Sequence, residues 1–134
     1  MDLSMQIIKA DILMAQQGIE LYKRKEIKEI KNQAAYHIQQ AVEKLIKIQV
    51  YSSGVNYNNK SLYVHNIGSL ISYASGLAIP MDIPKDIFDN AVMISDWEAS
   101  GRYDIHFSVR IDTLEKYLKI VEEWHSRLYK SGIK

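Results

Sequence analysis

Apolar residues recur every three or four positions along most of this chain, the spacing of amphipathic helices. The stripe is clearest in the middle of the chain, where Ala34, Ile38, Ala41 and Leu45 share one face of a predicted helix that ends at Gly54. Similar stripes predict four further helices, over about residues 3–25, 65–75, 82–100 and 110–129. The pattern predicts an all-α fold, an up-and-down bundle of about five helices in one domain over residues 1–134.

Local signals set the expected helix ends. Asp82 followed by Pro84 predicts the start of the fourth helix, and Asp112 with Glu115 has the spacing of a capping box for the fifth. Gly18 destabilises the first predicted helix by about 1 kcal/mol relative to an Ala at the same position. Residues 55–61 are expected to form a polar loop.

The composition limits the kinds of functional site that the chain can form. The 134 residues carry a net charge of +1 and no Cys, so we expect no disulfide, thiolate zinc site or cysteine nucleophile, and we expect a cytoplasmic protein. No leader segment or transmembrane run is expected. Any nucleic-acid contact must come from a local patch. One such patch is the run 23–31, with five basic and two acidic residues, and we favour a solvated linker over an RNA contact for it.

Motifs for a metal or a nucleotide cofactor are missing from the sequence. The four histidines form no His-Glu-x-x-His pattern, and the six glycines form no phosphate-binding loop. We therefore expect no metal and no cofactor. His125 lies on the apolar stripe of the last predicted helix and is expected to be a satisfied core residue, while His65 is expected to begin or cap the third helix.

Three segments, in this order, resemble HEPN domains, a family of small helical domains. Residues 35–47 read Ala-Tyr-His-Ile-Gln-Gln-Ala-Val-Glu-Lys-Leu-Ile-Lys, and this is the most specific of the three. Residues 65–70 read His-Asn-Ile-Gly-Ser-Leu, and residues 101–104 read Gly-Arg-Tyr-Asp. The resemblance implies a helical bundle that forms a homodimer and associates with nucleotides, RNA or a nucleotidyltransferase partner, as in toxin–antitoxin pairs.

The resemblance also suggests a catalytic pair, Arg102 and His106. Ribonucleases of the family carry an Arg and a His separated by four to six residues, whereas three residues separate them here. A His can accept the proton of a ribose 2′-hydroxyl, and an Arg can stabilise the phosphorane charge. The alternative is that Arg102 pairs with Glu98 or Asp104 and that His106 is a surface residue of a loop.

Lys44 and Lys47, with Arg102 and Tyr103, are the expected nucleotide- or RNA-binding residues. The alternative for the two lysines is a solvated helix face with Glu43 nearby. Four of the nine tyrosines gather around the loop after the second predicted helix: Tyr51, Tyr57, Tyr63 and Tyr73. They could stack on bases or belong to the core or a dimer interface, and we favour an interface for some of them. Three functions therefore stay open: a regulatory module with a nucleotidyltransferase partner, a metal-independent endoribonuclease, and a helical adaptor for other proteins.

Overall fold

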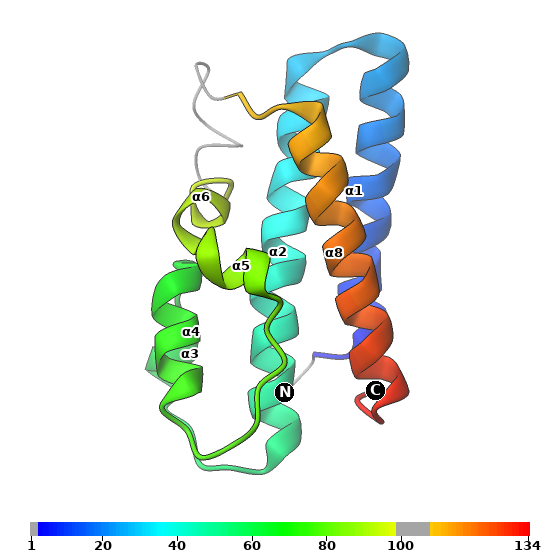
Figure 1. Ribbon diagram of the computed structural model, residues 1–134. Helices are drawn as coiled ribbons and strands as arrows, with labels where there is room; N and C mark the ends of the chain where they lie inside the picture. The colour runs from blue at the N-terminus through cyan, green and yellow to red at the C-terminus, as the bar shows by residue number, and fades with distance from the viewer. Residues whose placement is uncertain (1–2, 99–107) are drawn as a thin grey trace.

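Three long helices lie side by side in the computed structural model, which describes residues 3–98 and 108–134 (Figure 1). Helix α1 (Met5–Lys25) and helix α2 (Lys28–Ser53) form an antiparallel hairpin, and helix α8 (Ile111–Lys130) packs against both. Both ends of the chain lie at the same end of this layer (Figure 1). The described residues contain no strand, and the predicted all-α class is confirmed.

Four short helices cover the remaining side of α2. They are α3 (Asn59–Leu62), α4 (Ile67–Ser75), α5 (Lys85–Asp89) and α6 (Ala91–Ser95). Helix α4 packs against α2 and α6, so α2 has α1 and α8 on one side and the short helices on the other (Figure 1). This central position explains why α2 is buried on most of its circumference, with side chains such as Ile38, Leu45 and Ile46 fully inside.

The hairpin between α1 and α2 is tight. Glu26 adopts a left-handed conformation, with φ of 54°, and donates its backbone N–H to Tyr22 over 2.7 Å. Helix α1 continues through Gly18, where an added Cβ would lie 3.2 Å from the Cβ of Ala34. The glycine that weakens the helix locally therefore allows α1 and α2 to approach closely.

Two expected helix caps are wrong. Asp82 does not cap α5, whose N-cap is Pro84, because its carboxylate binds Arg127 through two bonds of 3.0 and 3.1 Å. Helix α8 begins after Arg110 without a side-chain cap, so the expected capping box is also wrong. The side chains of that box pair elsewhere: Asp112 with Arg110 at 3.0 Å and Glu115 with Lys23 at 2.7 Å.

The predicted fourth helix is divided, and a helical turn occurs where a loop was expected. The helix breaks at Asn90, whose side chain donates to the Asp86 carbonyl over 2.9 Å, and this local bond competes with the regular helix pattern. Within the expected loop, Asn58 caps the single-turn α3 by accepting from the Lys60 N–H. These two changes explain why the described residues contain seven helices rather than five.

Candidate functional site

Helix α2 carries polar side chains at buried positions, where the centre of a helical bundle normally has apolar ones. Gln39, Gln40 and Glu43 are 0%, 9% and 4% exposed, and all three belong to the segment that resembles HEPN domains. Buried polar groups must be hydrogen-bonded or they destabilise the fold. We therefore follow the partners of this segment in two groups, the Glu43 cluster and the Asp11 cluster.

The Glu43 cluster joins α2 to the start of α4. The buried carboxylate of Glu43 accepts from Nδ1 of His65 over 2.8 Å and lies 3.5 Å from Nζ of Lys47. Gln39 donates to the backbone carbonyl of His65 over 3.2 Å and accepts from Gln40 over 2.7 Å. His65 is thus held at its side chain and its backbone, while its imidazole remains 64% exposed.

The geometry of His65 leaves one ring nitrogen available. Because Nδ1 donates to Glu43, the neutral imidazole presents Nε2 as its acceptor. A buried carboxylate that orients an exposed imidazole is an arrangement proteins use for proton transfer and for binding. The expectation that His65 caps α4 is wrong, since Asn66 is the N-cap and accepts from the Ser69 N–H over 2.9 Å.

The Asp11 cluster joins α1 to α2. Asp11 accepts from Nδ1 of His37 over 2.9 Å and from Nζ of Lys44 over 2.6 Å. Burial alone would raise the pKa of Asp11, but the hydrogen bonds and charges of His37 and Lys44 outweigh it and hold the pKa below the ordinary 3.8. The carboxylate is therefore ionised and stabilises the hairpin.

This lowered pKa predicts how stability depends on pH. A depressed carboxyl pKa stabilises the fold above the pKa of the unfolded chain, and that stability is lost as pH falls through the folded pKa. We expect the free energy of unfolding, measured by urea titration, to fall between about pH 5 and pH 2, and to fall less steeply in Asp11→Asn. Asp112→Asn, which removes an exposed carboxylate, is the control. Equal slopes in both variants would refute a special role for Asp11.

Lys44 and Lys47 each already bind a carboxylate. Their side chains are 28% and 13% exposed, so neither lies on a fully solvated helix face. The ammonium group of either lysine could bind a phosphate only after its ion pair with the carboxylate breaks. Arg102, Tyr103 and His106 lie outside the described residues.

The residues that flank this undescribed segment are anchored to the long helices. Before it, the buried Trp97 packs edge-on against Tyr117 of α8, with ring centroids 5.8 Å apart. After it, Ser108 accepts from Nζ of Lys31 on α2 over 3.3 Å. Lys31 is only 8% exposed, so this end of the run 23–31 is not the solvated linker that we expected.

The expected gathering of tyrosines is confirmed. The rings of Tyr51 and Tyr57 are 5.3 Å apart, and the hydroxyl of Tyr73 accepts from the Asn58 N–H over 2.6 Å. Burial raises the pKa of Tyr51, with smaller contributions from Tyr57, Tyr63 and Glu43. Tyr63 is 80% exposed.

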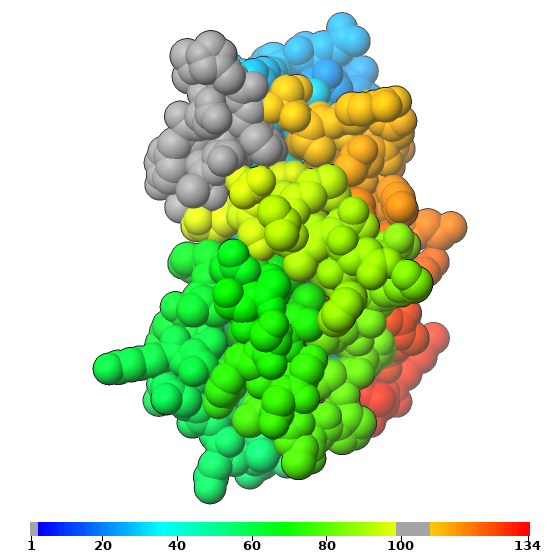
Figure 2. Space-filling model, turned by 60° about the vertical axis from the view of Figure 1, so that its left-hand side comes forward, coloured from blue at the N-terminus to red at the C-terminus, as the bar shows by residue number. Residues whose placement is uncertain are grey.

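We call the group of Tyr51, Tyr57, Tyr63, Lys60 and His65 the tyrosine surface. It belongs to the part of the chain from the end of α2 to the start of α4, and the green part of the chain that includes it lies in the lower half of the face in Figure 2. Between Glu43 and Asp82 the chain has no Asp or Glu at all. This acid-free stretch could have been noticed in the sequence, but the pairing of its His65 with the buried Glu43 could not.

The last histidine behaves partly as expected. His125 donates from Nε2 to the Met5 carbonyl over 2.8 Å, so it is satisfied, but it is only partly buried. The neighbouring Trp124 occupies the core position instead and is fully buried.

Over residues 3–98 and 108–134, no group of three or more His, Asp or Glu could hold a metal ion. Nor does any helix in those ranges have the length and apolar character to cross a membrane.

Comparison with known proteins agrees with this architecture. A family model described as the HEPN domain matches residues 11–130. The match covers nearly the whole chain, including both polar clusters, and the chain belongs to the HEPN domain family. Searches of curated proteins and of solved structures find no match.

Proposed function

We propose that this chain is a dimeric HEPN module that binds single-stranded RNA and acts with a nucleotidyltransferase, as one half of a toxin–antitoxin pair. The observation that carries the RNA part is the tyrosine surface, where the exposed ring of Tyr63 and the partly exposed rings of Tyr51 and Tyr57 belong to the same acid-free part of the chain as an oriented histidine. Aromatic rings stack on unpaired bases of any sequence, and the absence of carboxylates avoids repulsion of phosphates.

The individual residues have distinct parts in this proposal. Tyr63, being the most exposed, offers a ring face to a base. His65 presents its Nε2 to a hydroxyl or to a base edge, because Glu43 fixes the ring from behind. Lys60 is exposed and supplies a phosphate contact without breaking an internal ion pair.

The face of α1 beside the Asp11 cluster supports the dimer. Ile7 and Met14, 43% and 52% exposed, lie one helical turn before and after Asp11 on the same side of α1. Asp11, His37 and Lys44 are already paired with one another, so a second copy could cover this face without stranding a charge. The molar mass from sedimentation equilibrium tests the dimer, and co-purification with the product of a neighbouring gene tests the nucleotidyltransferase partner.

Loss of one ring should weaken RNA binding measurably. We expect Tyr63→Ala to weaken the binding of a labelled single-stranded RNA by about 5- to 150-fold, since stacking contributes about 1–3 kcal/mol per base. Lys60→Gln should weaken RNA binding moderately. It should also make the slope of the logarithm of the binding constant against the logarithm of the salt concentration shallower by about one. Fluorescence anisotropy in EDTA at several salt concentrations measures both effects. Because both side chains are exposed, the variants should fold normally, which circular dichroism verifies.

The matched control is Tyr129→Ala, which removes a half-exposed tyrosine from α8. Equal weakening by Tyr129→Ala, or no RNA binding by the wild type, would overturn the RNA proposal. The second outcome, together with a stable protein complex, would favour a helical adaptor. Electrophoresis of the same RNA tests the alternative of an endoribonuclease: cleavage in EDTA that disappears in His106→Ala and Arg102→Ala would establish it.

A further inference from the structure

The Glu43 cluster divides one carboxylate between a histidine and a lysine. Oε1 of Glu43 accepts from Nδ1 of His65 over 2.8 Å, and Oε2 lies 3.5 Å from Nζ of Lys47. The lysine neutralises the carboxylate, and the carboxylate fixes the ring and keeps its proton on Nδ1. Within the described residues no group binds Nε2, so its lone pair is available on a side chain that is 64% exposed.

The Asp11 cluster has the same connections, but its histidine is far less accessible. Oδ1 of Asp11 accepts from Nδ1 of His37 over 2.9 Å, and Oδ2 accepts from Nζ of Lys44 over 2.6 Å. The side chain of His37 is only 22% exposed, and its ring lies edge-on to that of Tyr36, with centroids 5.2 Å apart. The two clusters therefore combine the same three kinds of group, and the accessibility of the ring distinguishes them.

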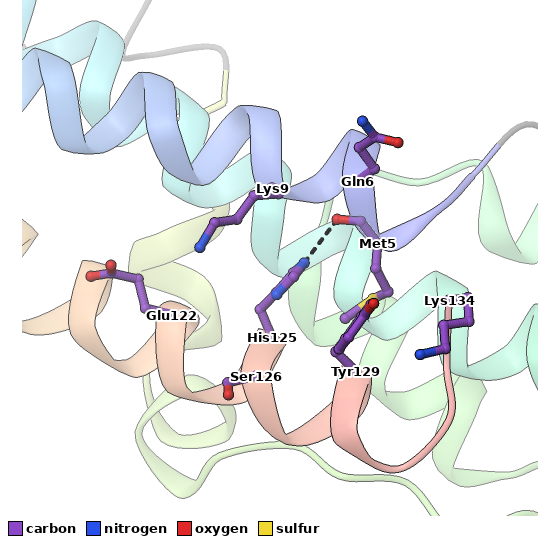
Figure 3. Close-up of a pocket in the computed structure, with 8 residues that line it drawn as sticks. All are labelled: Met5, Gln6, Lys9, Glu122, His125, Ser126, Tyr129 and Lys134. Carbon is purple, nitrogen blue, oxygen red and sulfur yellow. Dashed lines mark hydrogen bonds between the residues drawn. The ribbon is translucent and has the colours of Figure 1, made fainter.

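The third histidine that the structure describes uses Nε2 internally. Nε2 of His125 donates to the Met5 carbonyl over 2.8 Å and therefore carries a proton (Figure 3). Among the histidines in residues 3–98 and 108–134, only His65 thus combines an exposed ring, a fixed orientation and an unoccupied Nε2. These three properties together make a ring nitrogen a nucleophile that a bulky donor can reach.

The stretch of chain around His65 suits an added negative charge. Residues 44–81 contain no Asp or Glu, so this stretch has no carboxylate to repel a phosphoryl group. Lys60 in α3 is exposed, and α3 packs against α4, which begins two residues after His65. A dianionic group is therefore better tolerated here than on a stretch of mixed charge.

We propose that Nε2 of His65 accepts a phosphoryl group from a donor with a labile P–N bond, as in a phosphoramidate. The lone pair of Nε2 attacks the phosphorus and forms a new N–P bond. The P–N bond of the donor breaks, and the protonated donor nitrogen leaves with the electron pair as a neutral base. His65 keeps its Nδ1 proton, and the carboxylate of Glu43 balances the positive charge of the phosphorylated ring. This modification goes beyond RNA binding and does not depend on it.

Incubation of the full chain, without a histidine tag, with phosphoramidate at about pH 8 tests the proposal. We expect an acid-labile phosphoryl group on His65, located by mass spectrometry, and phosphorus NMR should place it on Nε2 rather than on Nδ1. His65 should react at least about tenfold faster than His37, because its ring is more accessible. His65→Gln should abolish the fast reaction, whereas the matched control His37→Gln should leave it unchanged.

Glu43→Gln tests the carboxylate as the group that positions the ring. The amide keeps an acceptor for Nδ1, so the nitrogen chemical shifts of the His65 ring should still show the proton there. Phosphorylation should nevertheless slow by about tenfold, because an amide does not balance the charge of the ring.

Three results would overturn the proposal: no phosphorylation of the wild type, faster phosphorylation of another histidine, or a phosphoryl group on Nδ1 of His65. The first and third are read from the wild type, so they do not depend on the folding of a variant. The measurement contains no RNA. A chain that accepts the phosphoryl group but binds no RNA would refute only the RNA proposal, and the reverse would refute only this one.

Discussion

Replacing Glu43 with Ala is expected to lower the free energy of unfolding by about 3 kcal/mol. The carboxylate is 4% exposed and pairs with both Lys47 and His65. Its removal leaves the Lys47 ammonium group, in a side chain only 13% exposed, without its counter-charge. We place this loss of stability at the lower end of the range for buried ion pairs that lose one partner, because the exposed imidazole of His65 can form a hydrogen bond with water instead. Urea denaturation, followed by circular dichroism, measures it.

Three further variants separate burial from charge. Glu115→Ala removes the same side chain from an exposed pair with Lys23 and should cost less than about 1 kcal/mol. Glu43→Gln keeps an acceptor for His65 and should cost about 1–2 kcal/mol. Glu43→Leu combined with Lys47→Met removes both charges and should recover most of the loss. If Glu43→Ala proves as mild as Glu115→Ala, Glu43 does not stabilise the fold as argued.

The long helices could be predicted from the sequence because their stripes are long and regular. The observed α1, α4 and α8 begin within two residues of the predicted starts, and α2 stops at Gly54 as expected. The sequence predicts no definite start for α2, which begins at Lys28, because the charged run 23–31 hides it. Helix periodicity does not show that Lys31 turns inward to Ser108.

Short-range signals failed where distant residues compete for the same group. Asp82 has the sequence context of a helix cap, but Gln49 from α2 and Trp124 from α8 bind its backbone, and Arg127 binds its carboxylate. These partners are between 33 and 45 residues away in sequence, so no local rule could weigh them. Tertiary contacts of this kind override local propensity.

Only part of the candidate site could be predicted from the sequence. The Gln-Gln-Ala-Val-Glu-Lys segment was singled out by resemblance, but its periodicity did not predict that its polar residues are buried. They are buried because α4 packs against the second side of α2. The pairing of Glu43 with His65 spans 22 residues and the pairing of Asp11 with His37 spans 26. Both pairs depend on how the helices pack, which the spacing of residues along the chain does not give.

Replacing Trp124 with Ala is expected to cost more than any other change considered, about 4 kcal/mol. Its side chain is fully buried, and Nε1 donates to the Asp82 carbonyl over 2.8 Å. The loss combines a large cavity between α8 and α2 with a missing hydrogen bond. Urea denaturation measures the effect, and Phe88→Ala, which removes a 60% exposed ring from α5, should change stability by less than about 0.5 kcal/mol.

A conservative variant divides the two contributions and tests what Trp124 holds in place. Trp124→Phe keeps most of the volume but loses the bond to Asp82, so it should cost about 1–2 kcal/mol. A cost equal to that of Trp124→Ala would mean that the hydrogen bond, not the packed volume, dominates. Because Asp82 lies just before α5, both variants should also raise amide hydrogen exchange in α5 and α6 before it rises in the α1–α2 hairpin. Uniform exchange across the chain would instead show that the two layers unfold as one unit.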